Sequence, residues 1–305
     1  MTTGTVAGWQ MWGFGLVRGA SQIFFQQNLV SGALVLAAFV VADWRMAVLA
    51  LLGAVGGMLG GLATGYRSAD IVAGMQSFCG TLVGAAVFAA LGGGAWWSYV
   101  LAFAGGLATG PVTRLVDALF TRTALKRYRL PYTTAPFVVV ATVITLTTTA
   151  LATPAAASDL PDDPVPAFLL SLLTNVSQVV LIDNPICGAL ILAALFVASW
   201  RVGLAGVLGS AVGSIVAVAL GESWSDIANG LANYSGVLTA IALAVTFLRS
   251  SVGSWLYAVP WIAVTAVVTL VMHRAGIVTY TWPYILTSWV ALVVAFYIRG
   301  LVRTS

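Results

Sequence analysis

The feature that most constrains this chain is the length of its uncharged apolar stretches. Residues 81–113 and 254–272 carry no acidic or basic side chain. Only 7% of the chain is charged, against about a quarter of a soluble domain, and 60% is hydrophobic. Uncharged runs of about 18 residues or more predict membrane-spanning helices. Because the strand-like alternation of an outer-membrane barrel is absent, we predict an all-α integral membrane protein.

The polar composition narrows the function classes. Two cysteines, Cys79 and Cys187, stand in apolar context without disulfide or metal-ligand spacing, so neither redox chemistry nor a metal site is expected. The formal charge of +4 comes mostly from loop positions, which suits anionic lipid headgroups better than nucleic acid. The first apolar stretch begins near Trp9 without a basic region before it or a cleavage site after it. We expect a first helix there and not a signal peptide.

One polar motif occurs twice in this apolar chain. Residues 21–32 read Ser-Gln-Ile-Phe-Phe-Gln-Gln-Asn-Leu-Val-Ser-Gly, and residues 177–188 read Ser-Gln-Val-Val-Leu-Ile-Asp-Asn-Pro-Ile-Cys-Gly. The offset is 156 residues (177 minus 21). Polar side chains are costly at membrane depth, so a repeated framework of Ser-Gln, Asn and Gly predicts a functional axis.

Further matches extend this duplication over most of the chain. The segment that starts at Asp70 with Asp-Ile-x-x-Gly aligns with the segment that starts at Asp226, again at an offset of 156 (226 minus 70). A Thr-x-Pro element at Thr134 recurs at Thr281, with an offset of 147 (281 minus 134). We therefore predict two membrane repeats joined by an acidic linker. Their predicted boundaries are residues 1–152, 153–165 for the linker, and 166–305.

Charged residues in the loops predict the orientation of the repeats. The loop 120–130 is strongly basic, whereas its counterpart before the second Thr-x-Pro element carries only His273 and Arg274. The linker has aspartates and no base, and the C-terminal tail has arginines and no acid. Under the positive-inside rule the loop 120–130 and the C-terminus are cytoplasmic and the linker is outside, so the repeats are inverted. The other residues behind this prediction are Arg122, Lys126, Arg127, Arg129, Asp159, Asp162, Asp163, Arg299 and Arg303.

Each repeat contains six apolar segments, but an inverted repeat requires an odd number of crossings. The segments least suited to crossing are 71–91 and 225–247, because glycines and polar residues interrupt them. Interrupted helices at matching positions point to a permeation site, since non-helical backbone at membrane depth survives only beside protein or a wet cavity. We predict about five transmembrane helices and one re-entrant half-helix per repeat. The other first-repeat segments lie near 9–27, 31–43, 46–64, 96–119 and 133–152.

The polar residues of the repeated motifs are nearly all neutral amides and hydroxyls. Such groups form hydrogen bonds without presenting a fixed charge. They predict a substrate that is small, polar and uncharged. The residues concerned are Gln22, Gln26, Gln27, Asn28, Gln76, Ser77, Thr133, Thr134, Gln178, Asn184, Asn233, Ser235 and Thr281.

Taken together, the motifs resemble the urea transporter family. The Ser-Gln-x-x-x-x-x-Asn, Asp-Ile-x-x-Gly and Thr-x-Pro-Phe/Tyr elements each occur twice and in this order, and the resemblance covers about residues 15–290. It implies a homotrimer in which every protomer holds a selective, channel-like urea pore between its halves. Because urea is planar, with four N–H donors and one carbonyl, the implied pore is a flattened slot with acceptor oxygens on its edges and apolar faces.

The resemblance also implies roles for individual residues. Gln22 and Gln178 would bind urea near the two ends of the filter. Thr134 and Thr281 would narrow its centre and offer hydroxyl oxygens, and backbone carbonyls around 75–78 and 231–234 would complete a ladder of acceptors. The slot walls would be formed by Phe25, Phe78, Leu82, Leu181, Tyr234 and Leu238.

Some residues depart from the family pattern. Leu29 stands where the second repeat has Pro185, so a helix break is less strongly predicted in the first repeat. Cys79 and Ser235 replace an asparagine that the family commonly shows.

Three acidic residues in the motifs are interpreted as structural or peripheral. Asp70 and Asp226 precede the broken helices, and we interpret them as N-caps. For Asp183 we expect a capping or vestibule role.

These features predict a passive urea channel of the inner (plasma) membrane, multi-pass, in contact with lipid, and without an enzymatic step, cofactor, metal or nucleic-acid partner. Ion coupling would require ionisable groups in the membrane core, which are almost absent. An alternative is a channel for other small neutral solutes, such as short amides or water. Ammonia is disfavoured because His273 is the only histidine and lies near a loop. A membrane enzyme would need a clustered nucleophile, metal ligands or a carboxylate pair, which the repeats lack.

Overall fold

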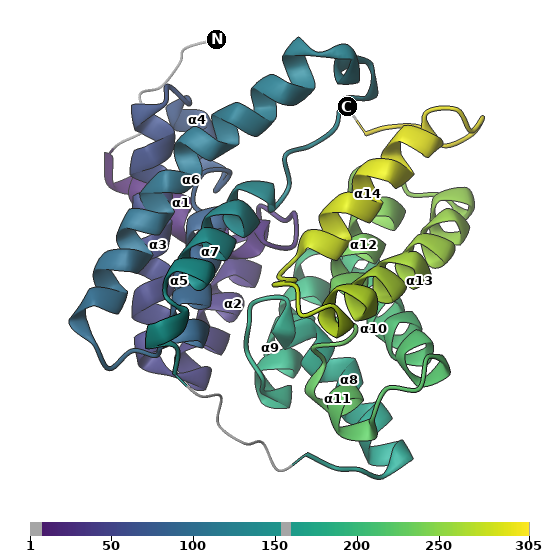
Figure 1. The fold of residues 1–305 in the computed structure, drawn as a ribbon. Helices are drawn as coiled ribbons and strands as arrows, with labels where there is room; N and C mark the ends of the chain where they lie inside the picture. Colours follow the sequence, from purple (N-terminus) through teal and green to yellow (C-terminus); the bar gives the residue numbers. More distant parts are fainter. Residues whose placement is uncertain (1–7, 154–159, 305) are drawn as a thin grey trace. The chain divides into compact units, whose positions relative to one another are not determined.

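The computed structural model describes residues 8–153 and 160–304, which fold into helices (Figure 1). Within these residues there is no β-strand, and the only extended pairing is an isolated bridge between Leu248 and Arg303. The predicted all-α class is confirmed. Asp159 of the acidic linker lies outside the described residues.

The chain divides into two compact units. The first unit comprises Met1–Val116 and Pro136–Pro154, and the second comprises Asp117–Ala135 and Ala155–Ser305. The units therefore follow the two sequence repeats except at residues 117–135. That segment belongs to the first repeat but packs with the second unit.

Both repeats use the same order of α-helices. The first repeat forms α1 (Gly8–Gln22), α2 (Leu29–Ala42), α3 (Trp44–Ala63), α4 (Ser68–Val72), α5 (Phe78–Leu91), α6 (Trp96–Arg122), η1 (Ala124–Tyr128), α7 (Ala135–Thr147) and η2 (Thr149–Leu151). The second forms α8 (Pro164–Gln178), α9 (Pro185–Ala198), α10 (Trp200–Ala219), α11 (Trp224–Asn229), α12 (Ser235–Ile241), η3 (Ala242–Thr246), α13 (Val252–Arg274) and α14 (Trp282–Ala295).

Four of the described helices are long and apolar enough to cross a membrane. They are α3, α6, α10 and α13, with 20, 27, 20 and 23 residues. The other apolar helices have 10–17 residues, because the chain breaks its helices at matching points of each repeat. The predicted interruptions in 71–91 and 225–247 are present, as the gaps between α4 and α5 and between α11 and α12. The number of crossings stays a prediction.

Glycines allow the helices around these breaks to pack at backbone contact. A Cβ atom on Gly53 of α3 would lie 2.1 Å from the carbonyl oxygen of Gly80 in α5, and a Cβ on Gly80 would lie 2.1 Å from the Gly53 oxygen. The second unit repeats this arrangement, since a Cβ on Gly209 would lie 2.4 Å from the Gly236 oxygen. Any side chain here would push the two helices apart, so small residues are required at this crossing.

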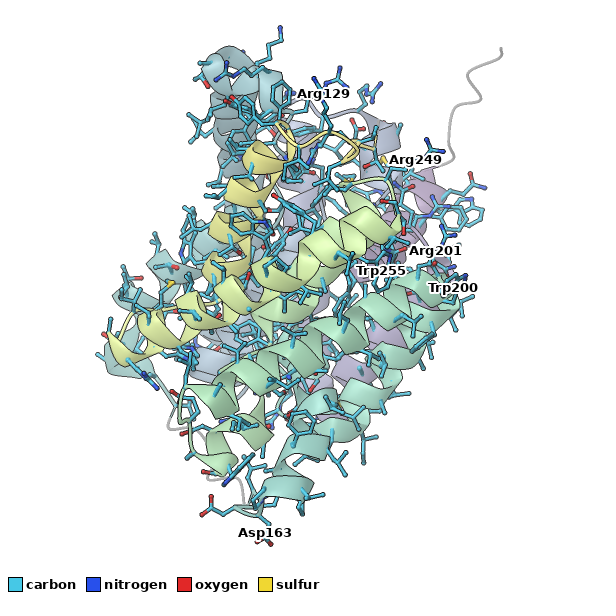
Figure 2. The ribbon with its side chains drawn as sticks, turned by 90° about the vertical axis from the view of Figure 1, so that its right-hand side faces the viewer. Arg129, Asp163, Trp200, Arg201, Arg249 and Trp255 are labelled. Carbon is cyan, nitrogen blue, oxygen red and sulfur yellow. The ribbon has the colours of Figure 1, made fainter. Side chains whose placement is uncertain are left out.

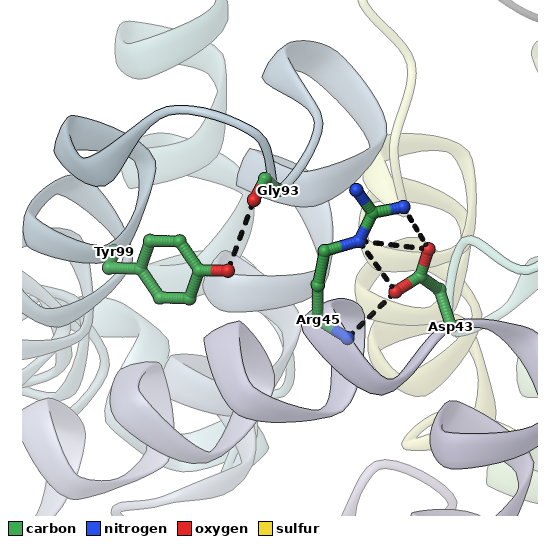
Figure 3. Close-up of polar contacts among 4 residues, drawn as sticks. All are labelled: Asp43, Arg45, Gly93 and Tyr99. Carbon is green, nitrogen blue, oxygen red and sulfur yellow. Dashed lines mark hydrogen bonds and ion pairs between the residues drawn. The ribbon is translucent and has the colours of Figure 1, made fainter.

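The turn between α2 and α3 differs between the repeats. Asp43 caps α3 by accepting from the Arg45 backbone N–H at 2.7 Å, and its second oxygen accepts from Arg45 Nη2 at 2.6 Å. Figure 3 shows this pair beside the hydrogen bond from the Tyr99 hydroxyl to the Gly93 carbonyl. The equivalent residue in the second repeat, Ser199, makes no capping hydrogen bond. Among the described residues, an arginine pairs with a carboxylate at this position in the first repeat only.

We expect the substitution Asp43→Asn to remove an acid-sensitive part of the stability. The hydrogen bond from Arg45 lowers the pKa of Asp43, so the carboxylate stabilises the fold above about pH 4 and loses this effect as the pH falls through the lowered pKa. Asparagine still caps the helix, so the loss at neutral pH should stay below about 1 kcal/mol. Tm measured from pH 7 to pH 3 in detergent should fall more in the wild type than in Asp43→Asn, and parallel curves would contradict this.

Candidate functional site

The repeated Ser-Gln motif ends α1 and α8 in the same tight turn. Gln26 N–H donates to the Ser21 carbonyl at 3.1 Å, and Phe25 N–H donates to the Gln22 carbonyl at 2.9 Å. This pair of bonds is the Schellman pattern, which normally places glycine in the left-handed conformation. Here Phe25 has φ 63°, and its counterpart Leu181 has φ 65°. The turn explains why α1 stops at Gln22, before the predicted end at residue 27.

The two glutamines that the sequence singled out are anchored in the same way. Gln22 Nε2 donates to the Ala73 carbonyl at 2.9 Å, and Gln178 Nε2 donates to the Asn229 carbonyl at 3.0 Å. Because a carbonyl only accepts, these bonds fix which end of each amide carries the NH₂ group. Neither Oε1 accepts a hydrogen bond from a described residue. Both side chains are almost buried, 6% and 5% exposed, so each presents an oriented acceptor oxygen.

Each anchor lies at the helix break of its own repeat. Gly74 (φ 80°) and Gly230 (φ 79°) turn the chain there in a conformation that favours glycine. A Cβ on Gly74 would lie 2.5 Å from the Gly19 nitrogen, and one on Gly230 would lie 2.8 Å from the Asn175 nitrogen. Because these two glycines have no side chain, each helix break packs directly against the backbone of α1 or α8. The amide of Gln22 or Gln178 can therefore reach a carbonyl of the break.

The asparagines of the motif start the next helices. The Asn28 side chain accepts from Ser31 N–H at 2.9 Å, and that of Asn184 accepts from Ile186 N–H at 2.8 Å. The first helical residues are Leu29 and Pro185, so α2 begins where α9 begins. Leu29 therefore does not remove the helix break that its departure from the pattern questioned, because the asparagine cap alone defines it.

The predicted wall residues are divided between the units. Phe78 (4% exposed) and Leu82 (0%) stand one turn apart on α5, while Leu238 stands one turn after Tyr234 in the second unit. The other two wall residues, Phe25 and Leu181, which adopt the left-handed conformation, are half-buried. The three wall residues of the first repeat therefore belong to the first unit, and the three of the second repeat belong to the second unit.

The two threonines, by contrast, meet in one unit. Thr134 and Thr281 both belong to the second unit, and their Oγ1 atoms form a hydrogen bond at 2.7 Å. The residues before them, Thr133 (φ 49°) and Tyr280 (φ 38°), share a positive φ and are related by the same offset of 147 (280 minus 133). The threonines therefore bond to each other and form a matched pair from the two repeats.

A buried polar cluster in the second unit joins Asn233, which the sequence singled out, to three residues that it did not. Asn175 Nδ2 donates to Ser210 Oγ at 2.9 Å and to Ser214 Oγ at 3.0 Å, and Asn233 Nδ2 donates to Ser214 Oγ at 2.7 Å. At the offset of 156 the first three of these align with Gly19, Ala54 and Met58, so the first unit has no such cluster. The sequence signal that could have revealed the cluster is the replacement of small or apolar residues of the first repeat by polar residues in the second. Its direct effect is to join α8, α10 and the helix break by hydrogen bonds.

The two aspartates before the breaks occupy different positions from those predicted. The N-caps are Arg67 and Ser223, and Asp70 and Asp226 are the third residues of their helices. Asp70 accepts from Arg67 N–H at 3.2 Å, and the Ser223 hydroxyl donates to Asp226 Oδ2 at 2.5 Å. The N-cap assignment was wrong by three residues, because the third residue can also accept from the cap. Their role at a helix start is structural.

A polar cavity of about 410 Å³ adjoins the Gln178 anchor in the second unit. Glu222 pairs there with Arg274 at 2.6 Å, and His273 Nε2 shares a hydrogen bond of 2.8 Å with Thr279 Oγ1. The cavity is lined by Glu222, Asp226, Asn229, Leu231, Ala232, His273, Arg274 and Ile277. An open cavity therefore reaches Asn229, the residue whose carbonyl holds Gln178.

We predict that Phe25→Gly is more stable than Phe25→Ala. Both substitutions remove the ring, but alanine keeps the cost of the left-handed conformation, so glycine should gain about 1 kcal/mol over alanine. At Val30, an exposed position of helix α2, the order should reverse. Tm measurements on the four variants test this, and a common order at both positions would show that the Phe25 conformation carries no strain.

Comparison with known proteins finds similarity to urea transporters, both in a family model and in individual relatives. A family model described as urea transporter matches residues 15–296. Urea transporter 1 of Rattus norvegicus is 28% identical over 235 residues, which cover 73% of this chain and 60% of the relative. Urea transporter 1 of Mus musculus is 28% identical over 236 residues, and that of Ovis aries is 26% identical over 237, with the same shares covered. The chain spans 60% of the length of these curated relatives.

Proposed function

The chain belongs to the urea transporter family, and from this we propose that it carries urea passively across a membrane through a selective, channel-like pore. The observation that carries the proposal is the pair of anchored glutamines. Each repeat holds one amide by its NH₂ group on the carbonyl of a helix break and leaves Oε1 as an oriented acceptor. No covalent step is needed for such transport.

The chemistry of urea matches these acceptors. Urea offers four N–H donors, and each must exchange water for another acceptor during passage. An unpartnered polar group would cost roughly 2–7 kcal/mol, so acceptors must follow one another closely. Gln22 and Gln178 supply amide oxygens, and Thr134 and Thr281 supply hydroxyls between them. We propose that these four residues bind urea in succession, helped by the carbonyls of the helix breaks.

The apolar residues would select for flat solutes. We propose that the apolar walls of a slot are formed by Phe25, Phe78, Leu82, Leu181, Tyr234 and Leu238. Apolar faces offer no hydrogen bond to an ion's hydration shell, so charged solutes would have to shed water without replacement. Neutral planar solutes would pass by using their edges.

The finer architecture also belongs to this proposal. We infer a homotrimer of multi-pass protomers in an inner (plasma) membrane, each with two inverted repeats and with lipid around it. Figure 2 shows Arg129 and Arg249 near one end of the second unit and Asp163 at the other end. Under the positive-inside rule this supports a cytoplasmic C-terminus, since Arg249 N–H is bonded to the Val302 carbonyl at 2.7 Å.

Stopped-flow flux in proteoliposomes tests the function. Vesicles with the protein should equilibrate urea much faster than empty vesicles, and glycerol or ammonia should show little acceleration. Equal urea rates with and without protein would refute the proposal. Faster passage of formamide or acetamide than of urea would favour the alternative, a channel for small neutral solutes in general.

A further inference from the structure

Tyr234 carries a hydroxyl that its counterpart in the first repeat lacks. The residue at the offset of 156 is Phe78 (234 minus 156), and both aromatic rings are buried, 2% and 4% exposed. In the second unit the Tyr234 hydroxyl donates to the backbone carbonyl of Tyr280. An aromatic wall requires only the ring, so the hydroxyl has a separate task.

The carbonyl that receives this bond belongs to a residue in an unusual conformation. Tyr280 has φ 38°, which non-glycine residues rarely adopt and which neighbours must therefore hold. The next residue is Thr281, whose Oγ1 lies 2.7 Å from Thr134 Oγ1. The hydroxyl of the preceding residue, Thr279, is held by a hydrogen bond to His273 and also interacts with the Tyr234 hydroxyl. The conformation of Tyr280 thus determines where the Thr281 hydroxyl points.

The backbone of Tyr234 is also bonded to the helix break of the second repeat. Tyr234 N–H donates to the Gly230 carbonyl at 3.1 Å, and the residue before that glycine, Asn229, accepts from Gln178. A continuous set of contacts therefore runs from the Gln178 anchor through residues 229–234 to Tyr280 and the threonine pair. In the first repeat the Phe78 N–H likewise donates to the Gly74 carbonyl, at 3.4 Å, but its side chain has no donor with which to extend the contacts further.

We propose that Tyr234 is a positioning residue, whose hydroxyl holds Tyr280 so that the Thr281 hydroxyl faces Thr134 at the narrowest point of the path. The effect of Tyr234 on flux rests on the proposed urea transport. The hydrogen-bond geometry does not depend on that function. It assigns Tyr234 a second role besides that of a wall, and it makes the filter chemically unequal in its two halves.

Flux measurements test the functional part. Tyr234→Phe keeps the ring and should lower urea flux about three- to tenfold, the effect of one lost hydrogen bond. The control is Tyr257→Phe, which removes a similar bond from a hydroxyl to the Ala291 carbonyl (2.6 Å) elsewhere in the unit. If Tyr234 acts through Thr281, then Tyr234→Phe should have little further effect in a Thr281→Val background. Additive losses would overturn the proposal, as would equal fluxes for Tyr234→Phe and wild type.

Disulfide trapping tests the geometry without any urea. In a background with Cys79→Ala and Cys187→Ala, the pair Thr134→Cys and Thr281→Cys should oxidise readily, because the two hydroxyls it replaces are in contact. Mass spectrometry should find the crosslink reduced several-fold by Tyr234→Phe and unchanged by Tyr257→Phe. Equal crosslinking in all three backgrounds would refute the positioning role. Wild-type vesicles that pass no urea, together with the expected crosslinking pattern, would refute the transport function alone.

Discussion

Replacing Gly230 by alanine should prevent most of the protein from folding. A Cβ atom there would lie 2.7 Å from the Thr174 carbonyl carbon and 2.8 Å from the Asn175 nitrogen, and neither backbone atom can move without displacing α8. The positive φ adds its own strain. We expect a loss of about 4 kcal/mol or more, the range of the most severe point substitutions. Size-exclusion chromatography and thermal unfolding in detergent would measure it.

Gly221→Ala is the matched control for this substitution. Gly221 has a similar φ of 75°, but a Cβ atom added there would meet no other atom within 4 Å. Only the conformational strain remains, so the cost should be about 1–2 kcal/mol. A Gly230→Ala variant as stable as Gly221→Ala would show that the helix break is not in backbone contact with α8.

Gln178→Leu should abolish most of the urea flux while leaving the protein folded. The substitution removes the acceptor Oε1 and also the donor that satisfies the Asn229 carbonyl. A lost hydrogen bond that leaves a polar group unpaired costs about 1–3 kcal/mol, so flux should fall about ten- to hundredfold. Stopped-flow urea flux, normalised to the amount of reconstituted protein, gives the result directly.

Gln26→Ile provides the control for the glutamine. Gln26 belongs to the same motif, but its amide bonds only the nearby Phe24 carbonyl at 3.0 Å, and its counterpart in the second repeat is Ile182. Flux should therefore stay within about twofold of wild type, because no acceptor of the duplicated pair is lost. Equal losses in both variants would mean that the motif tolerates no change and that Gln178 has no special role.

Much of the fold was predictable because its signals are local. Uncharged apolar runs predict helices in any tertiary context, and glycines with polar neighbours predict where those helices break. The left-handed turn at Phe25 was not predictable, because nothing in Ile-Phe-Phe-Gln distinguishes a C-terminal turn from one more helical turn. Tertiary contacts override the helical preference there, and α1 stops at Gln22.

The candidate site was predictable in its residues but not in its contacts. The duplication selected Gln22, Gln178, Thr134 and Thr281 without any structural knowledge. It could not show that each glutamine bonds a carbonyl 51 residues away or that the threonines bond each other across 147 residues. The role of the Tyr234 hydroxyl was equally unpredictable, because an aromatic side chain can form a wall with or without a hydroxyl.

The sequence by itself determined the helical class, the twofold internal repeat, the positions of the helix breaks and the neutral polarity of the repeated motifs, since each depends on residue type at a fixed spacing. The tertiary structure decided which distant atoms meet: the amide of Gln178 with Asn229, Thr134 with Thr281, and residues 117–135 with the second unit. The physical reason is that hydropathy and backbone preference act within a few residues, whereas these contacts depend on how the helices pack. Glycine contacts such as that of Gly230 set that packing.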